Sequence, residues 1–299
     1  DIGRKFVDDR VGRTPLEAAT RAGLRRGLLS KSLFGAALGL GRLARPFLPR
    51  ALASSIPQAR EAGAWPAPRH SRKVVVAQGC VQPSLAPNID AAAARVLDRA
   101  GISAIAVDGG GCCGALPYHL SEHDEARALA RRNIDAWWPH VENGAEAIVM
   151  TASGCGVMLR DYGHVLAQDP AYAAKAAKIV ALVKDPVQIV AAEWRTLAPQ
   201  LANRPARPRL AFHPPCTLQH GFAIRGEVER LLGVDDQLDR LRAVGELHHR
   251  HEHEQRDHER RDARRSGYHR QRSCPSSAAS GESSPRWASS PRSSRSASP

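Results

Sequence analysis

Four cysteines in the middle of the chain lie beside glycines, where apolar, β-branched segments end. Cys80 ends the segment KVVVAQGC, Cys112 and Cys113 lie in VDGGGCCG, and Cys155 ends VMTASGC. Thiolates are the usual ligands of soft metals and iron–sulfur clusters. If the apolar segments are neighbouring parallel strands, their carboxyl ends lie along one edge of a sheet. The sequence therefore predicts that these thiols meet and hold a metal or a cluster.

Other interpretations of the same cysteines stay open. A disulfide is disfavoured, because no secretory signal is seen and a bond between vicinal cysteines is strained. Free cysteine is also a common small core residue, and a redox-active thiol is a further option. The interval between Cys80 and Cys112 is too long for a zinc finger, in which ligands pair within a few residues. It fits a strand–helix–strand unit, so a folded domain would have to assemble the site.

The hydrophobic pattern predicts strands that alternate with helices. Apolar, β-branched runs give strands at 73–80, 102–109 and 145–155, and a later one at 208–216 that ends at Cys216. Helices are expected at 88–101, 121–144 and 171–183. Asn88 is the expected N-cap of the first helix. The second opens with Ser121 and acidic residues, which suits the positive end of the helix dipole. This alternation predicts an α/β fold with a parallel sheet.

The chain divides into regions of different composition. Residues 1–70 are basic, and their apolar residues recur at three- and four-residue spacing, which predicts amphipathic helices. Residues 71–205 read as one α/β domain, and 206–233 begin a second copy of its opening strand and cysteine. Residues 234–299 are rich in Arg, His and Ser, and we expect a disordered low-complexity tail. Its Cys274 and its histidines are interpreted as incidental.

The charge and hydropathy of the chain exclude several classes of function. The net charge is +13, but the basic residues are spread along the chain without a recognition motif, which argues against nucleic-acid binding. No run of about 20 apolar residues occurs, so no segment is expected to span a bilayer. The amphipathic stretch from Ser30 to Leu43 is expected to pack on a neighbouring domain or subunit, with a membrane surface as the alternative.

The cysteine pattern resembles a known domain. The series Cys80, Cys112-Cys113-Gly114 and Cys155 is similar to the cysteine-rich CCG domain of heterodisulfide reductase subunits and of iron–sulfur subunits of flavin-linked dehydrogenases. The segments TASGCG, FHPPCTLQHG and RPFLP are most similar to iron–sulfur subunits of bacterial glycolate oxidases. The resemblance covers residues 1 to about 233. It implies a parallel-sheet CCG domain with strand-end cysteines, preceded by amphipathic helices and followed by the tail.

The resemblance also implies a cofactor and its ligands. We expect an iron–sulfur cluster of the 4Fe–4S type, with zinc as the alternative. Its expected ligands are Cys80, Cys112, Cys113 and Cys155, and Cys216 is a further expected metal ligand. Residues 71–205 would be a first CCG domain and 206–233 the start of a truncated second one. Residues 1–70 would link to a ferredoxin-type region that this chain lacks.

The implied function is electron transfer within a glycolate oxidase complex. The cluster would relay electrons from flavin-bearing subunits toward the quinone pool, and the chain alone would have no catalytic residues. The alternatives are a related subunit for lactate or glycerol 3-phosphate oxidation, a heterodisulfide-reductase-like thiol enzyme, or a zinc-bound scaffold. We expect a cytoplasmic protein, with peripheral attachment to the inner face of the cell membrane as a further option.

The sequence departs from the family pattern in several places. The two ferredoxin-type cysteine cassettes are absent, and Cys155 is the single thiol where the family has a C-x-x-C pair. No second cysteine pair follows Cys216. The last 66 residues do not resemble the family, which a shifted reading frame would explain. We therefore expect a fragment of a longer subunit.

Overall fold

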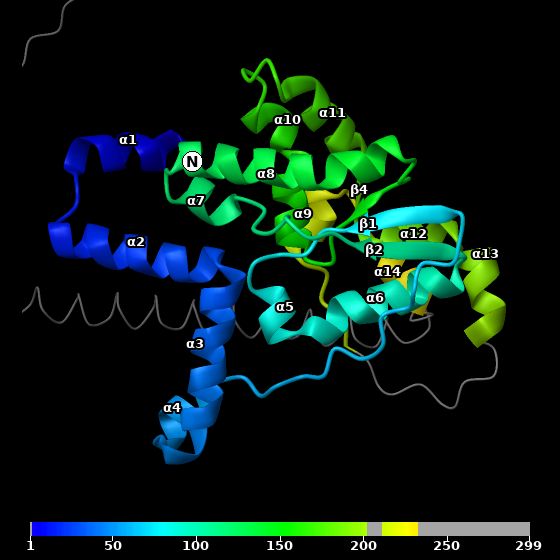
Figure 1. Ribbon diagram of the computed structural model, residues 1–299, viewed down its shortest axis with the longest axis horizontal. Helices are drawn as coiled ribbons and strands as arrows, with labels where there is room; N and C mark the ends of the chain where they lie inside the picture. The colour runs from blue at the N-terminus through cyan, green and yellow to red at the C-terminus, as the bar shows by residue number, and fades with distance from the viewer. Residues whose placement is uncertain (1, 202–210, 233–299) are drawn as a thin grey trace, which may run out of the picture. The chain divides into compact units, whose positions relative to one another are not determined.

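Four parallel strands in the order β2-β1-β3-β4 form one sheet in the computed structural model, which describes residues 2–201 and 211–232 (Figure 1). In the register, Val74 of β1 pairs with Ala104 of β2, and Val75 pairs with Ile148 of β3. The predicted α/β fold with a parallel sheet is confirmed. The strand bounds are β1 Arg72–Val76, β2 Ile102–Ala106, β3 Ile148–Val149 and β4 Val183–Lys184.

Helices cover both faces of this sheet. Val75 and Ile148 pack against α8 (His123–Glu142), α9 (Ser153–Arg160) and α11 (Ala173–Leu182) in one core cluster. Val74 and Val76 point the other way, where the second cluster holds the buried residues of α6 (Pro87–Arg99), α12 (Pro186–Ala192) and α13 (Trp194–Leu197). Each such valine is almost fully buried and contributes about 1.5–3 kcal/mol of transfer free energy. Burial on both sides explains why the strands read as continuous apolar runs.

Short elements connect these layers. They are α5 (Gln82–Leu85), α7 (Ala115–His119), α10 (Tyr162–Val165), α14 (Glu227–Leu232), the 3-10 turns η1 (Arg45–Phe47) and η2 (Ala198–Leu201), and the π-helical turn η3 (Thr217–Gly221). No helix in these described stretches is both long and apolar enough to cross a membrane. The predicted tail and residues 206–210 lie outside the described residues.

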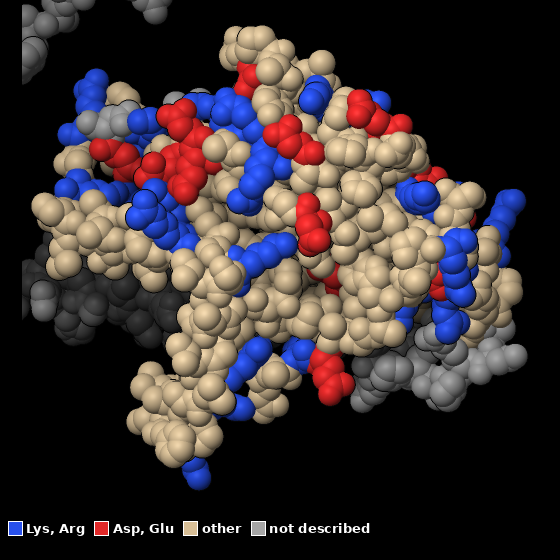
Figure 2. Space-filling model, viewed as in Figure 1, with Lys and Arg blue, Asp and Glu red and all other residues tan. Residues whose placement is uncertain are grey.

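Four helices precede the sheet, as the amphipathic pattern predicts. They are α1 (Ile2–Val11), α2 (Pro15–Leu29), α3 (Lys31–Ala44) and α4 (Arg50–Ser55). Thr14 starts α2 with a capping box, in which its hydroxyl accepts the Glu17 amide hydrogen at 3.3 Å. Ser30 starts α3 in the same way, by accepting the amide hydrogen of Leu33 at 3.3 Å. Much of the surface over α3 and α4 is uncharged (Figure 2).

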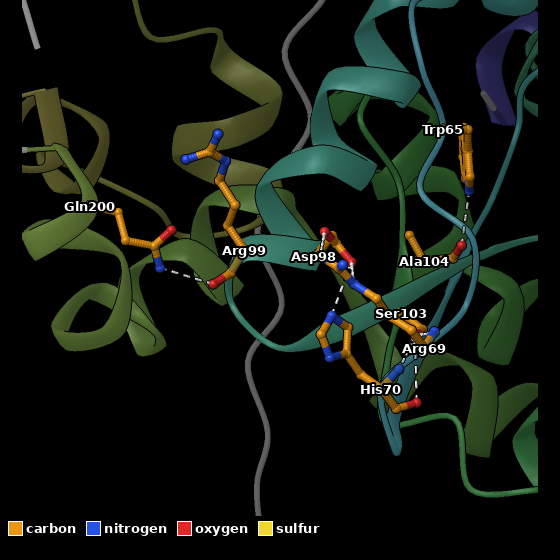
Figure 3. A network of polar contacts seen from close by, with 8 residues as sticks. All are labelled: Trp65, Arg69, His70, Asp98, Arg99, Ser103, Ala104 and Gln200. Atoms are coloured by element: carbon orange, nitrogen blue, oxygen red, sulfur yellow. Dashed lines mark hydrogen bonds and ion pairs between the residues drawn. The ribbon is translucent and has the colours of Figure 1, made fainter.

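A polar network fixes the linker between these helices and the sheet (Figure 3). The hydroxyl of Ser103 in β2 accepts the backbone N–H groups of Arg69 and His70 at 3.0 and 2.8 Å. The carboxylate of Asp98 in α6 accepts two hydrogen bonds from the Arg69 guanidinium, at 2.9 and 2.5 Å. It also contacts the His70 ring at 3.0 Å. These contacts hold the linker against β2 and α6 just before β1 begins.

Two predicted helix starts are wrong. Helix α6 begins at Pro87, with Ala86 rather than Asn88 as its N-cap, because proline suits the first position of a helix. Helix α8 begins at His123, because Ser121 adopts a left-handed conformation with φ of 67° and cannot be its N-cap. The predicted helix end at Gly101 is confirmed, since this residue follows α6 with φ of 78°.

The strands differ from the prediction at three places. The run from 145 to 155 holds only the two residues of β3, after which the chain turns into α9. Strand β4 was not predicted, because Val183 continues the apolar run of α11 and periodicity cannot separate the two. The strand expected at 208–216 is wrong for 211–215, which form no regular structure, and its first residues are not described.

Candidate functional site

The cysteines follow consecutive parallel strands at their carboxyl ends. Cys80 lies in the turn after β1, and Cys112 and Cys113 lie in the glycine-rich loop after β2. Cys155 comes after β3, but it occupies the first turn of α9 rather than a strand end. The carboxyl ends of parallel strands meet at one edge of a sheet, so the fold delivers all four thiols to the same edge.

The four thiols contact one another in a connected series. The Cys80 thiol interacts with the sulfur of Cys112. The Cys113 thiol interacts with the sulfurs of both Cys112 and Cys155. Cys112 and Cys113 are almost fully buried, whereas Cys80 and Cys155 are half-buried. We call these four residues the thiol cluster.

These contacts shift the pKa values of the four thiols in opposite directions. Hydrogen bonds from Cys113 and Cys80 lower the pKa of Cys112 to about 3. The Gly114 amide, 3.4 Å from the Cys112 sulfur, acts in the same direction. The pKa of Cys155 is lowered by the Cys113 hydrogen bond. The pKa values of Cys80 and Cys113 are raised, first by the hydrogen bond to Cys112 and then by burial or a further thiol contact. Metal binding would have to displace the protons of Cys80 and Cys113, because the thiolate is the metal ligand.

Two fully buried side chains hold the loop that carries the vicinal cysteines. Asn133 of α8 accepts the Gly111 amide hydrogen at 2.9 Å and donates to the carbonyl oxygen of Cys112 at 2.9 Å. Asn133 also donates to the Tyr162 hydroxyl at 2.8 Å, which in turn donates to the carbonyl oxygen of Cys113 at 2.9 Å. Because buried polar groups without partners are costly, this network fixes the loop in one conformation. We call Asn133 and Tyr162 the loop clamp.

Gly114 is required by the turn that follows the cysteine pair. Its φ is 90° and its ψ is −2°, a left-handed conformation that residues with a Cβ adopt at a cost. A Cβ at this position would also lie 3.2 Å from the carbonyl oxygen of Ala126 in α8. The glycine therefore lets the backbone turn close against α8 and direct its N–H at the Cys112 sulfur.

A buried carboxyl group lies behind the loop of Cys80. Asp90 of α6 accepts hydrogen bonds from the Gln82 amide at 2.7 Å and from the Thr151 hydroxyl at 2.6 Å. Gln82 also donates to the Thr151 hydroxyl at 2.5 Å. Burial raises the pKa of Asp90 above its ordinary value, although these hydrogen bonds oppose the shift. The network connects the loop after Cys80 to the segment that leads from β3 to Cys155.

Cys216 lies apart from the thiol cluster. Its side chain is exposed, and within the described residues it forms no hydrogen bond with the four thiols. The segment after it is nevertheless docked on α9, where the Thr217 and Ser153 hydroxyls lie 2.7 Å apart. Arg160 of α9 donates to the carbonyl oxygen of Gly221 at 2.8 Å. The structure thus docks the segment after Cys216 on α9, and the role of Cys216 as a metal ligand stays a prediction.

The donor set fits a cluster better than a single ion. Four sulfur donors are the ligands that iron–sulfur clusters use. Across residues 2–201 and 211–232, no three His, Cys, Asp or Glu side chains are arranged to hold one metal ion. The thiols form a series of pairwise contacts instead, which suits a group that presents several metal atoms to separate thiolates.

The sequence analysis missed the loop clamp and the buried Asp90. Asn133 did carry a signal, because it is the polar residue on the buried side of α8, whose other buried residues are Ala126, Ala130, Ile134, Trp137 and Val141. A lone amide on an apolar helix face predicts a specific buried partner. Tyr162 and Asp90 carried no such signal, because the fold brings their partners Cys113 and Thr151 to them from distant parts of the sequence.

Comparisons with known proteins find a domain family and two kinds of relative. Residues 74–160 match the cysteine-rich domain family CCG. The chain is 46% identical over 234 residues to the glycolate oxidase iron-sulfur subunit of Escherichia coli, and this match covers 78% of the chain and 56% of the relative. It is 31% identical over 114 residues to the probable glycolate oxidase iron-sulfur subunit of Bacillus subtilis, covering 38% of the chain and 25% of that protein.

A second kind of relative is more distant. The lactate utilization protein A of an Exiguobacterium species is 25% identical over 166 residues, which cover 53% of the chain and 62% of that protein.

The chain spans only part of its relatives. It covers about half the length of the glycolate oxidase subunit from Escherichia coli. No solved structure matches the chain.

Proposed function

Because this chain contains a CCG cysteine-rich domain and is homologous to glycolate oxidase iron–sulfur subunits, we propose that it is the CCG part of such a subunit. In this role it relays electrons from flavin-bearing subunits of a glycolate oxidase toward the quinone pool. The observation that carries the proposal is the buried thiol cluster, in which four cysteines from three strand–loop junctions contact one another.

The residues of the thiol cluster would hold an iron–sulfur cluster of the 4Fe–4S type. Such a group supplies one-electron transfer, and its potential depends on charge, burial and hydrogen bonds to sulfur. The chain contributes to each factor: the Gly114 amide points at the Cys112 sulfur, and the charge of Arg132 favours the Cys112 thiolate. The loop clamp would hold Cys112 and Cys113 in place while the charge of the site changes.

The chain itself would not oxidise the hydroxyacid. Its sequence has no flavin-binding fingerprint, and the described site consists of thiols and structural polar groups rather than a general base at a substrate pocket. Oxidation of glycolate would take place on a flavin-bearing partner, and the chain would accept the electrons. The protein is proposed to lie in the cytoplasm and to act at the inner face of the membrane that holds the quinone.

Lactate oxidation is the second candidate, and the similarity to lactate utilization protein A supports it. The thiol cluster would have the same role there, since the substrate is bound by another subunit. Expression of the chain in strains lacking either the glycolate or the lactate iron–sulfur subunit separates the two candidates. A longer version that restores only glycolate-dependent electron transfer would favour the first.

The cofactor is tested directly by anaerobic reconstitution of the full chain with iron and sulfide. We expect bound iron, a visible chromophore and a paramagnetic signal after one-electron reduction or oxidation. Zinc that binds in preference to iron and excludes the chromophore would instead support the zinc-scaffold alternative. An unloaded chain under conditions that load a known iron–sulfur protein would contradict the proposal.

Two cysteine variants sharpen this test. Cys113→Ser removes the thiol between Cys112 and Cys155 and should abolish iron loading, because these two sulfurs lose their common neighbour. Cys216→Ser is the matched control for the thiol cluster, and it also tests the predicted fifth ligand. Equal iron content in Cys216→Ser and wild type would remove Cys216 from the ligand set, whereas a partial loss would keep it there.

A further inference from the structure

The outer side of α3 is apolar along its whole length. The exposed residues on this side recur at three- and four-residue spacing, which places them on one face of the helix and of the corner that follows it. They are Leu33, Ala36, Ala37, Leu40, Leu43, Ala44 and Phe47. Leu43 and Phe47 are 74% and 89% exposed. We call this set the α3 face.

The opposite side of α3 is already occupied. Arg42 donates hydrogen bonds to the carbonyl oxygens of Pro57, Gln58 and Ser84, at 3.0, 3.2 and 3.4 Å. A Cβ on Gly35 would lie 3.2 Å from the Ser84 hydroxyl. The helix is therefore held from behind while the α3 face stays uncovered. Isolated exposed leucines are ordinary, but a contiguous apolar patch marks an interaction site.

The charge around the α3 face has one sign. The sequence has no acidic residue between Glu17 and Glu61, whereas Arg45 and Arg50 flank Phe47 at the tip. Arg45 donates to the carbonyl oxygen of Ala53, so its positive charge is not neutralised by this bond. In Figure 2 the surface over α3 and α4 shows blue atoms and no red ones. A partner for this surface must accept apolar side chains and balance positive charge.

We propose that the α3 face binds an anionic lipid surface. Leu40, Leu43 and Phe47 would enter the boundary between headgroups and acyl chains, and Arg45 and Arg50 would contact lipid phosphates. A second copy of the chain fits less well, because pairing the face with itself would bring like charges together. The inference rests on the proposed function in one respect, since it names the membrane as the surface at which electrons would reach a quinone.

Vesicle flotation of the full chain tests this inference. We expect the chain to float with vesicles that contain phosphatidylglycerol but not with vesicles of phosphatidylcholine alone, and to float less at high salt because headgroup contacts are screened. Leu43→Ser and Phe47→Ser should each weaken binding by about tenfold, since each removes an inserting apolar side chain. Leu16→Ser in α2 is the matched control, because Leu16 is 78% exposed but outside the face.

The basic residues after position 232 are present in every version, so the difference between wild type and variant reports on the α3 face alone. Absence of flotation, or equal loss with Leu16→Ser, overturns the inference. A dimer that Leu43→Ser dissociates, without vesicle binding, overturns it too and assigns the face to a second copy. Iron content is measured separately. A chain that floats without iron supports the inference and counts against the iron–sulfur cluster. A chain that binds iron but does not float supports the iron–sulfur cluster and overturns the inference.

Discussion

The hydroxyl of Tyr162 donates a hydrogen bond to the carbonyl oxygen of Cys113 at 2.9 Å, although 49 positions separate the two residues in the chain. The same hydroxyl accepts a hydrogen bond from Asn133, which holds the carbonyl oxygen of Cys112. The peptide groups of both vicinal cysteines are therefore fixed by side chains from α8 and α10. The thiols can be replaced or oxidised without breaking this support, so the loop clamp can be tested apart from the sulfurs.

Replacement of Tyr162 by Phe should destabilise the protein. The change removes the hydroxyl that donates to the Cys113 carbonyl oxygen and accepts from Asn133, which keeps its bonds to Gly111 and Cys112, so the free energy of unfolding should fall by about 1–3 kcal/mol. Tyr172→Phe is the control, because the Tyr172 hydroxyl donates to Asp135 at the surface, and its loss should cost about 0.5 kcal/mol or less. Urea unfolding of the metal-free chains compares the two. Equal stability of both variants would show that the clamp contributes nothing.

Gly114→Ala should disrupt the turn that follows the cysteine pair. The added Cβ would meet the Ala126 carbonyl oxygen at 3.2 Å, in a backbone with φ of 90°. The left-handed conformation alone costs about 1–2 kcal/mol for a residue with a Cβ. We expect lower thermal stability and less bound iron after reconstitution. Gly154→Ala is the control, because a Cβ there has no atom within 4 Å, and a comparable loss in both variants would contradict the argument.

The strand positions were predictable because they depend on local signals. Val74, Val75 and Val76 lie in a run that is buried on both sides, and such a run reads as a strand without knowledge of its neighbours. The glycines and cysteines after β1 and β2 mark the ends of these strands. Short-range patterns therefore predicted the sheet, its parallel direction and the edge at which the four thiols lie.

The contacts that complete the site depend on long-range packing, which the sequence does not display. Cys155 was expected at a strand end, but the small residues from Thr151 to Gly156 have no periodicity that separates a strand from the first turn of α9. Tyr162 lies in a four-residue helix with no sign of its buried partners. Strand β4 is only two residues long, and a parallel partner rather than its own composition defines it.

Asp90→Asn should raise the free energy of unfolding, relative to wild type, more at neutral pH than at acidic pH. Burial raises the folded-state pKa of Asp90, so ionisation costs stability as the pH rises from the unfolded value of 3.8 through the folded value. An amide oxygen can still accept the Thr151 hydroxyl hydrogen and carries no such cost. The stability difference, variant minus wild type, should therefore grow between pH 4 and neutral pH in urea unfolding. A difference that does not change with pH would contradict the raised pKa.

Cys112 should remain a thiolate in the reduced, metal-free chain at pH 6. An ordinary cysteine with a pKa of about 8.5 is almost fully protonated there. Hydrogen bonds from Cys113 and Cys80 hold the pKa of Cys112 at about 3, so its thiolate should persist until the solution approaches that pH. The ultraviolet absorbance of the thiolate, followed through an acid titration, measures this directly.

Cys112→Ser should remove about one thiolate equivalent at pH 6, because the sulfur that is stabilised as a thiolate by Cys113 and Cys80 is gone. Cys216→Ser is the control variant, because this exposed thiol forms no hydrogen bond with the thiol cluster in the described structure. If Cys112→Ser and wild type gave the same absorbance at pH 6, the ionisation pattern that we assign to the thiol cluster would be wrong.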